Sequence, residues 1–290
     1  MLLSANNRIV SLLVEHTSPV PWNNEAFDTL VVDPETKELI MALVTNKIEA
    51  SKSTDLMSGK GNGLIILLHG GPGTGKTLTA ESVAEFANKP LYRVTCGDIG
   101  TKPEDVEKYL TSVLYLGKIW DCVVLLDEAE VFLQTRDLED LQRNALVSVF
   151  LRVLEYYEGI LILTSNRVAT FDEAFKSRIQ LALHYEALKK EQRRQIWENF
   201  INRLKSFETD SIDTDDLRKN LNKLEKFDMN GRQIRNAVTT ARQLAMFKKK
   251  PMDFLVLEHV INVSSKFDTY LRQVNENLTD EEIARDKLVR

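Results

Sequence analysis

Residues 64–77, LIILLHGGPGTGKT, constrain the fold of this chain more than any other stretch. The run from Leu64 to Leu68 is apolar and rich in branched side chains, which is typical of a strand buried on both faces of a parallel sheet. It breaks into a turn that fits G-x-x-x-x-G-K-[ST], and residues 78–88, without glycine or proline, favour a helix. This order predicts a phosphate-binding loop, because backbone N–H groups and a helix N-terminus then converge on one point.

The residues of this loop have different expected roles. The glycines let the backbone turn inward around phosphate oxygens, and Lys76 supplies a positive charge for β- and γ-phosphates. The hydroxyl of Thr77 can ligate Mg²⁺, which takes few protein ligands. The alternative is an ordinary turn between a strand and a helix, but the flanking elements favour phosphate binding. The expected nucleotide-binding residues are Gly71, Pro72, Gly73, Thr74, Gly75, Lys76, Thr77 and Leu78.

Two later apolar stretches also end in polar residues. Residues 123–126 lead into Asp127 and Glu128, and residues 159–164 lead towards Asn166. Beside a phosphate-binding strand, we expect Asp127 to hold Mg²⁺ through its water shell and Glu128 to orient and polarise an attacking water. The amide of Asn166 can hydrogen-bond both the γ-phosphate and that water. Alone, the two acids are equally consistent with a solvated acidic turn, and an asparagine after a strand is more often a turn residue. The catalytic interpretation therefore depends on the upstream loop.

Strand and helix patterns alternate until about residue 187 and then give way to helices alone. The alternation predicts an α/β fold, a five-stranded parallel sheet with helices on both faces. The predicted strands cover 64–68, 90–95, 121–126, 159–164 and 179–184. The later helices are predicted at 189–205, 213–224, 230–247, 252–274 and 279–288. We expect an unassigned N-terminal extension at 1–24, a nucleotide-binding core at 25–187, a small all-helical domain at 188–275 and a charged tail at 276–290.

Composition narrows the environment and the partners. The net charge of −5 gives no strong nucleic-acid signal, and the run Lys248–Lys250 favours a solvated helix end. The two cysteines lack metal-binding spacing, which favours a reducing compartment. No apolar run is long enough to span a bilayer, and the N-terminus lacks the pattern of a signal peptide. We therefore expect a soluble intracellular protein, in either cytoplasm or nucleus.

Five motifs in order carry a family resemblance over roughly residues 25–250. They are GGPGTGKT, LLDEAE, TSNR, FDEAFKSRI and NGRQIRN, and together they resemble an AAA-type (AAA+) ATPase. The amino-acid sequence around these motifs is most similar to a group of fungal AAA ATPases. The resemblance implies ATP and Mg²⁺ as cofactors, a P-loop core with a helical lid, and assembly into a ring, expected to be a hexamer. It also implies that ATP hydrolysis drives conformational work on a protein or other macromolecular partner.

The resemblance also implies roles for individual residues. Lys76 and Thr77 match Walker A, Asp127 and Glu128 match Walker B, and Asn166 matches sensor 1.

Two arginines match motifs of the family outside these three. Arg178 matches the arginine finger, which stabilises charge on ATP held by a neighbouring subunit. Arg232 matches sensor 2, with Arg235 one turn later as a rival.

The sequence departs from the family in two places. Phe175 stands where many members have a second arginine, so only one finger is expected. Residues 97–100, GDIG, lack the aromatic residue of the loops that thread polypeptides, which argues against threading.

Two other function classes remain open. A nucleotide-dependent switch would bind ATP and turn it over slowly, and Glu128 argues against this because a pure binder has little need for a catalytic acid. A small-molecule P-loop kinase would use the helical domain as a substrate lid, and Asn166, Arg178 and the size of that domain argue against it.

Overall fold

The computed structural model describes residues 18–49, 63–95, 102–133, 140–166, 171, 173–205 and 211–274. Most of the predicted N-terminal extension, the charged tail with its predicted helix at 279–288, and the loop at 97–100 lie outside these residues.

Five parallel strands form one sheet in the order β2-β3-β4-β1-β5. This confirms the predicted α/β class. The strands are β1 (Leu64–Gly70), β2 (Leu91–Thr95), β3 (Val123–Asp127), β4 (Ile160–Ser165) and β5 (Leu181–Tyr185). Because the strands are parallel, the loops that follow β1, β3 and β4 all emerge at the same edge of the sheet, which is where ligands bind in open α/β folds.

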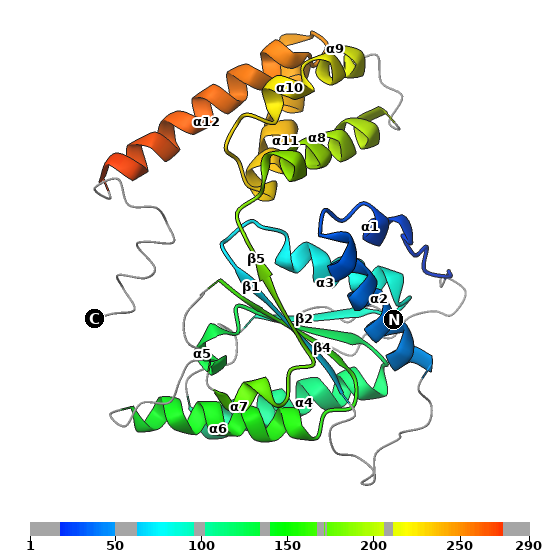
Figure 1. Ribbon diagram of the computed structural model, residues 1–290, viewed down its shortest axis with the longest axis vertical. Coiled ribbons are helices and arrows are strands. Elements are labelled where there is room, and N and C mark those ends of the chain that lie inside the picture. Colours follow the sequence, from blue (N-terminus) through cyan, green and yellow to red (C-terminus); the bar gives the residue numbers. More distant parts are fainter. Residues whose placement is uncertain are drawn as a thin grey trace.

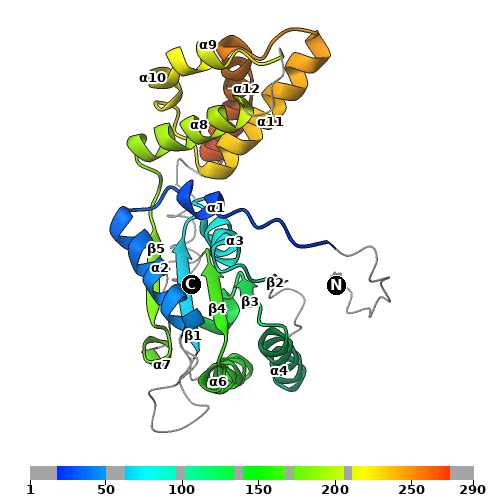
Figure 2. The same cartoon turned by 90° about the vertical axis from the view of Figure 1, so that its right-hand side faces the viewer.

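Helices cover both faces of the sheet (Figures 1 and 2). Alternate residues of β1 point to opposite faces, and both faces are closed, so the whole run Leu64–Leu68 is buried. One face packs against α1 (Glu25–Asp28), α2 (Pro34–Glu49) and α3 (Lys76–Phe86). The other face packs against α4 (Pro103–Ile119), α5 (Glu130–Leu133), α6 (Leu141–Glu155) and α7 (Glu173–Lys176).

The remaining helices form a separate layer above the carboxyl edge of the sheet, the lid (Figure 1). They are α8 (Lys190–Lys205), α9 (Thr214–Lys219), α10 (Leu221–Leu224), α11 (Gly231–Lys248) and α12 (Phe254–Val274). They enclose their own apolar core around Trp197, which is fully buried. The helix predicted over 213–224 is in fact two helices, because Asn220 ends α9 and its side-chain amide donates to the carbonyl oxygen of Asp216.

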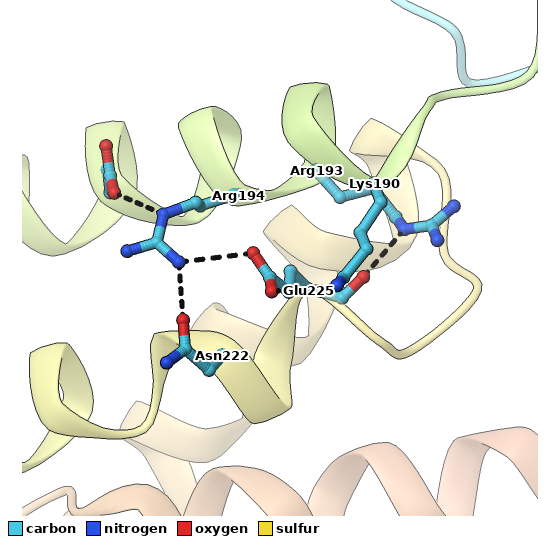
Figure 3. Close-up of polar contacts among 6 residues, drawn as sticks. Lys190, Arg193, Arg194, Asn222 and Glu225 are labelled. Carbon is cyan, nitrogen blue, oxygen red and sulfur yellow. Dashed lines mark hydrogen bonds and ion pairs between the residues drawn. The ribbon is translucent and has the colours of Figure 1, made fainter.

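A buried acid ties the lid helices to one another (Figure 3). The carboxylate of Glu225, just after α10, pairs with Lys190 and Arg194 of α8, both at 3.2 Å. Arg194 also donates to the side chain of Asn222 at 2.6 Å, and Arg193 donates to the backbone oxygen of Glu225 at 3.1 Å. All these bonds join α8 to the α10 segment, and they hold these two parts of the lid together.

Candidate nucleotide-binding site

The glycine-rich turn after β1 is shaped by residues that adopt left-handed backbone conformations. Gly73 has φ of 75° and Gly75 has φ of 108°, values at which a side chain would be strained. At Gly73 the position also lacks space, because a Cβ atom would lie 2.6 Å from the side chain of Asn230. The turn leads directly into α3, whose N-terminal N–H groups lie at the same point.

Lys76 is held inside this turn. Its side chain is buried, and its ammonium donates to the carbonyl oxygens of Gly70 at 2.8 Å and Gly71 at 2.6 Å. Burial lowers the pKa of Lys76 to about 8, with Arg232 adding to the decrease and Glu130 and Asp127 opposing it. The turn therefore contains a poorly solvated positive charge that a phosphate would stabilise strongly.

Asp127 lies beside this turn although it is 50 residues away in sequence. Its Oδ1 atom accepts from the hydroxyl of Thr77 at 3.3 Å and from that of Thr164 at 2.5 Å. Its Oδ2 atom accepts from Arg93 of β2 at 2.5 Å. The carboxylate is thus bonded on both oxygens, and Oδ1 is the one that faces the phosphate-binding turn.

Glu128 follows in a strained conformation. Its φ of 61° is unusual for a residue with a side chain, and the side chain itself is exposed. Its backbone N–H donates to the hydroxyl of Thr164 at 3.0 Å, and the next N–H, of Ala129, donates to the backbone oxygen of Thr164 at 2.8 Å. Strain of this kind is found preferentially at functional sites, where surrounding bonds maintain it.

The donors gathered here suit Mg²⁺ and a nucleotide. Mg²⁺ prefers oxygen ligands and is held by one or two protein groups together with phosphates. The hydroxyl of Thr77 and the carboxylate of Asp127 supply such oxygens, and within the described residues no cluster of three or more His, Cys, Asp or Glu forms a closed metal cage. The residues present therefore fit a metal that is shared with bound phosphate.

Two further predicted residues lie at the same edge. Asn166 is half-buried and directly follows β4, the strand between β1 and β3. Arg232 lies in the first turn of α11 and is near enough to Lys76 to lower its pKa. The N-terminus of α11 contacts the turn directly, since the N–H of Gly231 donates to the oxygen of Gly73 at 3.0 Å.

Arg178 lies elsewhere. It follows α7 and precedes β5, where the neighbouring Gln180 pairs with Ile65 near the start of β1, so it lies at the amino edge of the sheet. Its guanidinium donates to the oxygen of Ala174 at 2.9 Å and pairs with Glu155 at 3.4 Å. The site within one chain is therefore built without Arg178.

Arg93 and Thr164 were missed by the sequence reasoning. Arg93 lies in a short strand whose pattern gives no sign of which way its side chain points. Thr164 offered a weak signal, a hydroxyl at the end of an otherwise apolar buried strand.

Comparison with known families adds to this geometry. Residues 66–187 match the model of the ATPase family associated with various cellular activities (AAA), and residues 188–278 match the model of the fungal AAA+ ATPase lid domain. The chain belongs to the AAA family. The AAA model covers the strands and turns that carry the candidate site, and the lid model covers α8 to α12.

Curated relatives share the AAA region at moderate identity. Human ATPase family AAA domain-containing protein 3B is 30% identical over 143 residues, which are 45% of this chain and 21% of that protein. A 26S proteasome regulatory subunit homolog of Methanothermobacter marburgensis is 28% identical over 195 residues, 64% of this chain and 50% of that protein. The chain thus matches half or less of the length of each.

A solved structure supports the fold of the AAA chain. A chain of the E. coli MS115-1 HORMA:CdnC:Trip13 complex superposes with a TM-score of 0.58 at 16% identity, covering 82% of this chain and 90% of that one. At this identity the likeness concerns the fold. Among the described residues of this AAA chain, no helix combines the length and the apolar character needed to cross a membrane.

Proposed function

We propose that this chain binds ATP with Mg²⁺ and hydrolyses it, and that the energy drives conformational work on a macromolecular partner. The observation that carries the proposal is the contact between Thr77 and Asp127, at 3.3 Å. It brings the lysine-bearing turn, the metal-ligand oxygens and the acid turn to one point, as phosphoryl transfer requires. AAA family membership supports the same activity.

Each residue has a role that follows from its position. Lys76 and the N-terminus of α3 bind the phosphates, and Thr77 and Asp127 hold the metal. A bound Mg²⁺ neutralises the charge of the phosphate oxygens. Glu128, exposed at the edge of the site, accepts a proton from the attacking water, and Asn166 orients that water from the adjacent strand.

The lid supplies the coupling between nucleotide and movement. Arg232 lies in α11 at the point where the lid touches the turn, so a γ-phosphate there attracts the lid and its loss releases it. Because α11 shares one apolar core with the other lid helices, this local change is passed to the whole lid. The lid position then reports which nucleotide is bound.

Arg178 completes the site from a second copy in this proposal. Its own phosphate-binding turn lies at the opposite edge of the sheet, whereas a ring brings the amino edge of one subunit to the nucleotide of the next. The AAA family generally forms rings, and we propose a hexamer for this chain.

Phosphate release without any added acceptor tests the proposal. The Glu128→Gln variant is expected to bind a fluorescent ATP analogue normally and to release phosphate about 10²–10⁴-fold more slowly, the usual range for a positioned general base. Glu107→Gln, which removes a surface pair with Arg152, is the matched control and should stay within about twofold of the unmodified protein.

Three outcomes distinguish the function classes. Release that depends on Glu128 supports hydrolysis. Tight binding with negligible release by the unmodified protein would point to a switch. Release that appears only when a phosphate acceptor is added would point to a kinase.

A further inference from the structure

Thr164, the fifth residue of β4, makes three hydrogen bonds to the acid turn. Its hydroxyl donates to Oδ1 of Asp127 at 2.5 Å and accepts from the backbone N–H of Glu128 at 3.0 Å. Its backbone oxygen accepts from the N–H of Ala129 at 2.8 Å. One residue of the neighbouring strand therefore contacts three consecutive residues of the turn that carries both acids.

The hydroxyl is suited to this position because it donates and accepts at once. A carboxylate oxygen can only accept and a backbone N–H can only donate, so a group that bonds to both must do both. Thr164 is almost completely buried, which leaves no solvent to replace it. Without the hydroxyl, the N–H of Glu128 would lose the partner it has here, and an unpaired polar group in such a place is destabilising.

The same bonds explain how Glu128 keeps its left-handed conformation. A non-glycine residue with φ of 61° persists only when its surroundings hold it there. The two N–H bonds to Thr164 lie on either side of the Cα atom of Glu128, at residues 128 and 129, and so fix the peptide units that set this angle.

We propose that Thr164 is a positioning residue for both acids: its hydroxyl directs Oδ1 of Asp127 towards Thr77 and holds the backbone of Glu128 in the conformation that presents its carboxylate to the water. This inference rests on the proposed hydrolysis, and it adds a residue of β4 that acts through Asp127 and Glu128. Arg93 bonds the other oxygen of Asp127 and leaves Oδ1 to Thr164 and Thr77.

A pair of variants separates the hydroxyl from the rest of the side chain. Thr164→Val keeps the shape and removes the hydroxyl, whereas Thr164→Ser keeps the hydroxyl and removes the methyl group. We expect Thr164→Val to lower kcat about 10–100-fold, the range found for residues that orient metal-site ligands, and Thr164→Ser to stay within about threefold of the unmodified protein. A packing role predicts the reverse order.

Binding gives a readout that does not depend on turnover. The affinity for a fluorescent ATP analogue is measured with Mg²⁺ and with EDTA. In Thr164→Val the gain in affinity caused by Mg²⁺ should shrink, because Asp127 is no longer directed towards Thr77, while the affinity in EDTA should be unchanged. An undiminished Mg²⁺-dependent gain together with normal kcat overturns the inference.

A second pair protects the test against misfolding. If Thr164→Val does not fold, as judged by circular dichroism, Thr164→Ala is compared with Thr164→Ser, since both lack the methyl group and only one has the hydroxyl. Equal kcat and equal Mg²⁺ dependence in that pair also overturn the inference. The unmodified protein and Glu128→Gln are assayed in parallel. Negligible phosphate release by the unmodified protein means that the proposed hydrolysis itself fails, and full release by Glu128→Gln removes Glu128 as the general base. An inactive Glu128→Gln with an unaffected Thr164→Val removes only the role of Thr164.

Discussion

The two edges of the sheet hold their charged residues in different ways. At the carboxyl edge, Asp127 is bonded through both oxygens to residues from β2, β4 and α3, and Lys76 is enclosed by its own turn. At the amino edge, Arg178 donates to the end of the adjacent α7 and makes one long ion pair with Glu155.

This difference in how the charged side chains are bonded bears on the ligand that we propose for each edge. At the carboxyl edge the buried charges of Lys76 and Asp127 are held in place by hydrogen bonds, as buried charges must be paired or bound to be tolerated, and this arrangement fits the anion and metal of our proposal. A partly exposed ion pair such as that between Arg178 and Glu155 contributes little stability and can be exchanged for a stronger partner. In our proposal, the carboxyl edge binds a nucleotide within the chain, and Arg178 at the amino edge meets a charge on another molecule.

Lys76→Ala should have the largest effect and should act on the carboxyl edge alone. Loss of a buried charge that contacts phosphate is expected to weaken ATP binding about 10³-fold. Isothermal titration calorimetry on the folded variant measures the change. An unchanged dissociation constant would show that Lys76 does not bind phosphate. The proposed role of the carboxyl edge would then be wrong.

Arg178→Ala tests whether the amino edge serves a neighbour. A finger supplied in trans is typically worth about 10³–10⁵ in rate, and we expect a smaller loss, on the order of 10², because Arg232 also contacts the phosphates in the proposal. Nucleotide affinity should be little altered, in contrast to Lys76→Ala. Steady-state phosphate release and nucleotide titration give the two values.

A mixture of two inactive variants tests directly whether Arg178 serves a neighbouring subunit. Arg178→Ala and Glu128→Gln should each be nearly inactive, yet their mixture should recover part of the activity at interfaces that combine an intact Glu128 with an intact Arg178. Specific activity of the unmodified protein should also rise with concentration as subunits associate. No recovery and no concentration dependence would show that Arg178 acts within its own chain or not at all.

The lowered pKa of Lys76 predicts that ATP affinity at the carboxyl edge depends on pH. Burial lowers this pKa to about 8, so raising the pH from 7 to 9 neutralises the lysine in the free protein. If only the charged lysine binds phosphate, ATP affinity should fall about tenfold between pH 7 and pH 9, because at about one pH unit above the pKa only about a tenth of the lysine is still charged. Lys76→Met should show no such decrease between pH 7 and 9 when measured by the same titration.

The smallest expected effect distinguishes Arg232 from Arg235 as the lid residue that contacts the nucleotide. Arg232 is near Lys76, and Arg235 is an exposed residue of the next turn of α11. We expect Arg232→Ala to weaken ATP binding about two- to tenfold, as loss of one exposed charge-assisted contact does, and Arg235→Ala to have no measurable effect. The opposite order would assign the lid contact to Arg235.

The sequence predicted the fold well because its signals are local. Leu64–Leu68 reads as a buried strand from five residues alone, and the order of strands and helices then implies a parallel sheet. The positions of Asp127 and Asn166 followed from the rule that parallel strands end at one edge. The bonds from Arg93 and Thr164 to Asp127 could not be predicted, because they depend on side-chain directions between strands whose order only the structure reveals.

Gly73 lies where the phosphate-binding turn contacts the lid, and this contact leaves no room for a side chain. The backbone oxygen of Gly73 accepts from Gly231 at 3.0 Å, and a methyl group at Gly73 would lie 2.6 Å from Asn230. Any residue larger than glycine at position 73 would therefore collide with the residue that caps α11 and push the lid away from the phosphate-binding turn. The absence of a side chain at this one position is what lets a backbone hydrogen bond join the lid to the core.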